Sequence, residues 1–121
     1  MSKPAVSIFV FGIYLELLGL ILISAPNLIL NLLGMPSTGE VWIRVAAVLV
    51  LILGFFHIQA GRSEMTPFFH WSIYARSSLI LFFTAFAVLG LASPAIILFG
   101  VIDLAGAIWT NLAFRSQSKI F

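Results

Sequence analysis

The sequence predicts an all-α protein: a four-transmembrane-helix bundle that forms a single integral membrane domain over residues 1–121. Hydrophobic residues make up 62% of the chain and charged residues only 8%, whereas soluble domains carry about 25% charged residues. The mean hydropathy is +1.19. A soluble globule of this size could not cover so much apolar surface, so we expect the lipid bilayer to surround the protein.

Four apolar stretches reach the length of about 20 residues that a spanning helix needs. The expected spans are residues 5–24, 41–60, 67–91 and 94–114. Pro67 and Pro94 fall in first turns, where the missing N–H costs nothing, and Gly61 is expected to stop the second span. Residues 27–34 are too short to cross, and their leucines predict a short interfacial or re-entrant helix between spans one and two.

Lysine and arginine outside the spans predict the orientation. Lys3 precedes span one, Arg62 follows span two, and Arg115 and Lys119 follow span four, while the other two connections carry neither residue type. Positively charged loops remain in the cytoplasm. We therefore expect both termini to be cytoplasmic.

Composition and motifs exclude several classes of function. The chain carries six Lys and Arg, four Asp and Glu and a net charge of +2, which is too little charge for a basic nucleic-acid-binding face. It has no cysteine, which excludes thiol redox chemistry and Cys-ligated metal sites. There is no nucleophile elbow, no H-E-x-x-H and no glycine-rich phosphate loop. These observations favour a protein that is not an enzyme.

Four ionisable residues fall inside the expected spans: Glu16, Arg44, Arg76 and Asp103. Each charge costs about 2.5–3.5 kcal/mol on insertion scales, so it needs a partner or a function. At a rise of about 1.5 Å per residue, the two acids lie at similar depth, and both arginines can reach them. We predict a buried charge network in which Arg44 pairs with one acid and Arg76 with the other.

Small residues share the helix faces of the two acids: Gly12 and Gly19 with Glu16, and Gly100, Ala107 and Thr110 with Asp103. Such residues let helices approach closely in lipid, so these faces should point inward. Two interpretations of the charges stay open. They either form a structural network that fixes which helices are neighbours, or one acid is a proton or ligand site within a cavity.

Two histidines, His57 and His70, lie near the ends of spans that a short loop connects, among aromatic residues. Paired histidines on adjacent helices can ligate a b-type haem or a chlorin. Contact with a quinone or a lipid head group, or a chance placement across the hairpin, are the alternatives. His57 lies about 140° around its helix from Arg44, so one helix face cannot serve both.

The order of features resembles the DoxX-like superfamily of small four-helix bacterial membrane proteins. The resemblance rests on Glu16, the pattern G-L-x-L-I-x-x-P-N over residues 19–27, a leucine-rich piece ending at residues 34–36, Arg44 and Gly54, with Arg76 and Asp103 as further candidate matches. It implies an accessory subunit in the bacterial inner membrane, near quinone. Members are described as partners of redox enzymes, including thiosulfate:quinone oxidoreductase. The resemblance transfers no catalytic residue.

Small multidrug resistance transporters are also similar in helix number, in Glu16 and in the small-residue face of residues 94–106, but Arg44, Arg76 and Asp103 have no counterpart there. The favoured function is a non-enzymatic accessory subunit or a lipophile- or quinone-binding protein. The alternatives are a proton-coupled exporter of small cationic compounds that uses Glu16, and a haem- or pigment-binding electron-transfer subunit. Expected partners are the bilayer and other membrane subunits or a second copy, and no nucleic acid.

Overall fold

The computed structural model describes residues 1–118, of which 83% are helical and none lies in a strand. The elements are α1 (Lys3–Ser24), α2 (Pro26–Leu32), α3 (Trp42–Arg62), α4 (Thr66–Val88), the 3-10 turn η1 (Pro94–Ile96) and α5 (Ile97–Ser118). Among the described residues, four helices are long and apolar enough to cross a membrane, which confirms the expected number of apolar helices. The short helix before the second span is confirmed as α2. Lys119, part of the expected charge asymmetry, lies outside the described residues.

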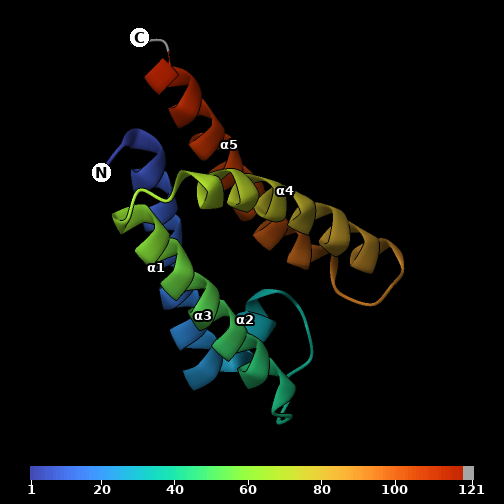
Figure 1. Cartoon of the computed structure of the whole chain (residues 1–121). Helices are drawn as coiled ribbons and strands as arrows, with labels where there is room; N and C mark the ends of the chain where they lie inside the picture. Colours follow the sequence, from blue (N-terminus) through green and yellow to red (C-terminus); the bar gives the residue numbers. More distant parts are fainter. Residues whose placement is uncertain (119–121) are drawn as a thin grey trace.

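The helices form two arms. α1 packs along α3, α4 packs along α5, and α1 also contacts α5. Figure 1 shows the two arms diverging from a common end, near the N-terminus and the turn from α3 to α4. We call this the closed end, formed by residues 2–8, 60–69 and 110–117. Away from it, α3 and α4 diverge; α2 lies on the inner side of the α1–α3 arm, and the connection from α4 to α5 lies at the far end of the other arm (Figure 1).

The closed end contains the apolar core and most of the polar contacts between the arms. Ala5, Ile8, Ala60 and Phe69 form the buried cluster. Both the backbone N–H and the hydroxyl of Ser2 donate to the Glu64 carboxylate. Further along, Lys3 Nζ donates to Ser116 Oγ at 3.2 Å, and the hydroxyls of Ser7 and Thr110 lie 2.7 Å apart.

Glycines explain the close approach of α1 and α3. A Cβ on Gly12 would lie 2.9 Å from the Gly54 carbonyl oxygen, and one on Gly61 would lie 2.9 Å from the Ala5 carbonyl oxygen. The expectation that Gly61 stops the helix is wrong, because α3 continues through Gly61 to Arg62. Gly61 serves helix packing, as small residues do in membrane proteins.

Left-handed residues terminate three helices in the same way. Gly34 (φ 69°), Glu64 (φ 53°) and Gly90 (φ 75°) follow α2, α3 and α4. In each case the next N–H bonds back to the last turn, as Leu91 N does to Phe86 O at 2.8 Å. The third span therefore ends at Val88 rather than at residue 91. Glu64 is the only non-glycine among the three, so its backbone is strained.

Candidate functional site

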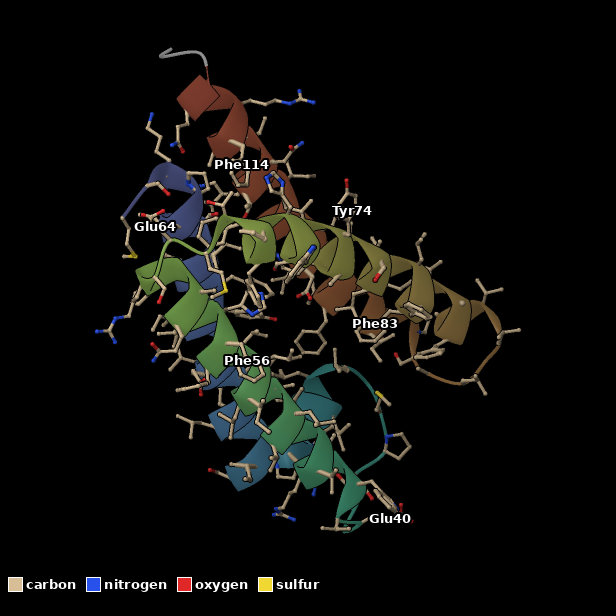
Figure 2. All side chains as sticks on the ribbon, in the orientation of Figure 1. Glu40, Phe56, Glu64, Tyr74, Phe83 and Phe114 are labelled. Carbon is tan, nitrogen blue, oxygen red and sulfur yellow. The ribbon has the colours of Figure 1, made fainter. Side chains whose placement is uncertain are left out.

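A cavity of about 600 Å³ occupies the space where the two arms diverge. Its walls are almost entirely apolar and come from all five α-helices. They include Leu18, Leu22, Ile29, Leu30, Val50, Leu79, Phe83 and Phe99. In Figure 2, Phe83 lies on the side of α4 that faces the α1–α3 arm, and Tyr74 points away from it. The volume falls in the range of about 300–1,000 Å³ typical of small-molecule sites.

Polar side chains gather at one part of this cavity. Tyr14, His57, Ser72, Arg76 and Asp103 all line it. They come from four different helices, and His57, Ser72 and Arg76 are buried. An apolar cavity with a few convergent polar groups is the usual form of a binding site for a small organic molecule.

Arg76 is only 3% exposed and is held by three neighbours. Its Nε donates to the Ser72 carbonyl at 3.2 Å, and its Nη2 donates to Thr110 Oγ1 at 2.9 Å. The guanidinium carbon lies 4.7 Å from the centre of the Phe11 ring, a cation–π contact. The remaining nitrogen, Nη1, is buried and has no hydrogen-bond partner.

Thr110 connects Arg76 to α1. Ser7 Oγ donates to the Pro4 carbonyl at 2.7 Å, so it can accept from Thr110 Oγ1, also at 2.7 Å. Thr110 Oγ1 in turn accepts from Arg76. Each hydroxyl then donates once and accepts once, and the Gly106 carbonyl, 3.2 Å from Thr110 Oγ1, is the alternative acceptor for the threonine hydrogen. The chain of bonds joins α4, α5 and α1 beside the polar part of the cavity.

His57 has hydrogen bonds at both ring nitrogens. Nδ1 lies 2.8 Å from the Leu53 carbonyl, and Nε2 lies 2.7 Å from Ser72 Oγ. A carbonyl only accepts, so we assign the hydrogen to Nδ1, and Nε2 accepts from the serine hydroxyl. Phe11 and Phe68 pack on the ring, with centroids 5.2 Å and 4.9 Å away. The imidazole is thus fixed in orientation and joins α3 to α4.

His70 lies in a different environment. It is exposed, and its ring stacks on Phe114 with centroids 4.4 Å apart. His70 precedes Ser72, the hydrogen-bond partner of His57, by two residues. The side chains of His70 and Ser72 therefore project about 200° apart around α4. The structure therefore does not bring the two histidines together. Among residues 1–118, no group of three or more His, Asp or Glu side chains could hold a metal ion.

The predicted ion pairs are not formed: within the described part of the chain, no salt bridge joins Glu16, Arg44, Arg76 or Asp103. Arg44 is exposed, and its Nε donates to the Ile23 carbonyl at 3.0 Å. This carbonyl lies in the last turn of α1, where unpaired carbonyls and the helix dipole attract a cation. The similar depths of Arg44 and the acids led to the prediction of an ion pair. The carbonyls at the end of α1 are nearer and take the place of the acid.

The two acids also separate. Glu16 is half-buried against α3, because a Cβ on Gly54 would lie 2.7 Å from its Oε1, and Glu16 does not line the cavity. Asp103 does line the cavity. It interacts electrostatically with Arg76 and with Tyr14, although it forms no ion pair. Of the four predicted charges, only Arg76 and Asp103 share a site.

Tyr14 is the site residue that sequence reasoning missed. Its hydroxyl is buried without a hydrogen-bond partner, and its ring lies 5.5 Å from that of Phe11. The available signal was a tyrosine within an otherwise apolar span, since a buried tyrosine hydroxyl normally finds a partner. Two unpartnered polar groups, Tyr14 Oη and Arg76 Nη1, thus accompany Asp103 around one cavity.

No protein-family model, curated protein or solved structure matches this chain. The resemblance to DoxX-like proteins therefore stays a prediction, and the functional argument rests on the cavity.

Proposed function

We propose that this protein is a non-enzymatic membrane protein of DoxX-like type that binds a lipophilic small molecule, with quinones as candidates, and that it serves as an accessory subunit. The observation that carries the proposal is the cavity of about 600 Å³ combined with the buried, unpartnered Nη1 of Arg76. The apolar walls would take a hydrocarbon tail, and the arginine would take an oxygen of the head group.

Energetics support this assignment. A buried donor without an acceptor costs about 1–3 kcal/mol, and more when the group is charged. A ligand oxygen at Arg76 Nη1 would remove this cost. Because lipid tails are as apolar as the cavity wall, the tail contributes packing rather than a hydrophobic gain. The polar contact would therefore contribute much of the selectivity for one lipophile over bulk lipid.

Access from the bilayer follows from the shape of the molecule. α3 and α4 diverge beyond the turn that connects them (Figure 1), and both contribute residues to the cavity wall. With cytoplasmic termini, as the positions of Lys3 and Arg62 favour, the closed end would face the cytoplasm. The lipophile would then enter sideways, in the half of the membrane farther from the cytoplasm.

The two alternative functions have less support. An exporter would need Glu16 at the substrate site, but Glu16 packs against Gly54 outside the cavity. A haem subunit would need His57 and His70 at one site, but both nitrogens of His57 are hydrogen-bonded and His70 stacks on Phe114 outside the cavity.

The proposal is tested by binding. The protein, reconstituted in lipid nanodiscs, is titrated with a short-tailed ubiquinone, and lipophiles that co-purify from the membrane are identified by mass spectrometry. Ala75 lines the cavity on α4, so the ring of Ala75→Phe should occupy part of it and reduce binding at least about tenfold, or ~1.4 kcal/mol. Ala85 is exposed on the same helix outside the cavity, so Ala85→Phe is the matched control. Absence of any bound lipophile in the native protein, or equal binding by both variants, would overturn the proposal.

A further inference from the structure

The polar part of the cavity contains more than an arginine, and its remaining groups restrict the head group. Resting on the proposed lipophile site, we infer that its ligand is a single-chain amphiphile with an uncharged head that carries both a hydrogen-bond acceptor and a donor. Asp103 is the residue that selects the donor.

The acceptor requirement comes from two hydrogen-bonding groups without partners. Arg76 Nη1 and Tyr14 Oη are both buried and unbonded. Nη1 lies against α5, 3.0 Å from where a Cβ on Gly106 would stand. Gly106 follows Asp103 by three residues, so the two positions share a helix face. A head group that reaches Nη1 therefore also comes close to Asp103.

The donor requirement comes from Asp103. It lines the cavity and accepts no hydrogen bond from residues 1–118. An ionised carboxylate only accepts, so a ligand that offers only an oxygen leaves it unsatisfied. A hydroxyl, such as that of a quinol, or an amide N–H on the head group would bond to it, whereas the oxidised quinone offers acceptors only and would bind more weakly. Leaving a polar group unpaired in a desolvated site is how binding sites reject analogues that lack one hydrogen-bonding group.

The requirement for an uncharged head follows from the opposite charges of Arg76 and Asp103, which both line the cavity. An anionic head beside Arg76 would also be repelled by Asp103, and a cationic head beside Asp103 would be repelled by Arg76. Charge in a site of low dielectric makes either repulsion costly. The cavity of about 600 Å³ also lies in the small-molecule range, which favours one chain over two.

The chain contains a reporter for the test, because Trp71 lines the cavity. With Trp42 and Trp109 changed to Phe, its fluorescence follows binding in nanodiscs. The probes share one tail: palmitamide (donor and acceptor), methyl palmitate (acceptor only), palmityl sulfate (anion) and palmityltrimethylammonium (cation). We expect palmitamide to bind about tenfold more tightly than the ester, a difference of ~1.4 kcal/mol, and both charged probes to bind more weakly still.

Two variants assign the preference to Asp103. Asp103→Asn can donate as well as accept, so the amide-to-ester ratio should fall to about one while the ester still binds. Tyr14→Phe removes a donor to the acceptor oxygen and should weaken both neutral probes alike. Glu16→Gln, an acid outside the cavity, is the control and should leave the ratio unchanged. Helical circular dichroism and gel filtration establish that each variant is folded.

The outcomes separate the two proposals. If no probe changes Trp71 fluorescence, the lipophile site itself is absent. If the probes bind but head group makes no difference, if the sulfate binds best, or if Asp103→Asn keeps the preference, the lipophile site stands and the assigned head group is wrong.

Discussion

The closed end and the cavity half of this molecule are built from the same four long helices but pack in opposite ways. At the closed end, Ala5 and Ile8 are fully buried, and hydroxyls and a glycine allow the helices to approach closely. In the cavity half, larger side chains such as Leu18 and Phe83 face a space that no other helix fills. The hydrogen bonds between Ser7 and Thr110 and between His57 and Ser72 join the arms, and the arms separate beyond these bonds.

The comparison teaches where the stability of a small membrane protein is located. Lipid is as apolar as leucine, so helices associate through close packing and hydrogen bonds rather than by removing apolar surface from water. Close packing within the α1–α3 arm continues along its length, at Gly12 and Gly19, but the hydrogen bonds between the two arms lie at the closed end and just beyond it. The cavity half can therefore be shaped for a ligand without loss of the contacts that hold the arms together.

The largest difference should appear when one aliphatic side chain is shortened in each half. Ile8→Ala should lower the free energy of unfolding by about 2–3 kcal/mol, the low end for buried large-to-small changes, because packing is lost without a change in hydrophobic transfer. Leu18→Ala, in the cavity wall, should cost about 1 kcal/mol or less because its side chain has fewer packed neighbours. Unfolding in mixed SDS micelles measures both. Equal costs would show that the two halves are packed alike.

A smaller effect is expected from breaking the hydrogen-bond chain between the arms. Thr110→Val keeps the shape but removes the acceptor of Arg76 Nη2, and should cost about 1–2 kcal/mol. Thr84 is exposed on α4 and provides the matched control, Thr84→Val, which should be near neutral. If the two substitutions lower the free energy of unfolding equally, the hydrogen bonds of Arg76, Thr110 and Ser7 do not hold the arms together.

The smallest effect is a pH dependence at the closed end. The hydrogen bonds from Ser2 lower the pKa of Glu64 below its usual value of 4.5. The folded-state pKa is thus below the unfolded one, so this stabilisation is present above about pH 4.5 and is lost as the pH falls through the folded pKa. Stability measured for native protein minus that for Glu64→Gln should therefore be positive at neutral pH and decrease on acidification. A difference that does not change with pH would contradict it.

Sequence alone predicted the helices well because a spanning helix is recognised from consecutive apolar residues, without knowledge of its neighbours. Hydropathy located four spans and the short α2, and Pro67 and Pro94 lie in first turns as expected. Gly100, Ala107 and Thr110 are buried, as the small-residue face predicted. Errors at helix ends came from Gly61, which packs inside α3, and from Gly90, which stops α4 early.

The site was harder to predict because it depends on the direction in which each side chain points. Arg44 was expected to pair with an acid, but it donates to a backbone carbonyl of α1, and every residue type carries such a carbonyl. Arg76 was expected to pair with an acid, yet it donates to Thr110 and to the Ser72 carbonyl, and its Nη1 has no hydrogen-bond partner. Tyr14 received no role because a single tyrosine in an apolar span carries no spacing information. Two charged residues at the same depth form a pair only if both helices are rotated so that the side chains face each other, and depth alone does not give this rotation.

The contacts of α1 have a consequence for how the protein is made. α1 touches α2, α3, α4 and α5. It is synthesised before each of them, so every later helix can dock on a surface that is already in the membrane. The α1–α3 pair can form first, through Gly12 and Gly54, while α4 and α5 are still in the ribosome. Assembly then needs no rearrangement of earlier contacts, and the cavity is completed only when the last two helices arrive.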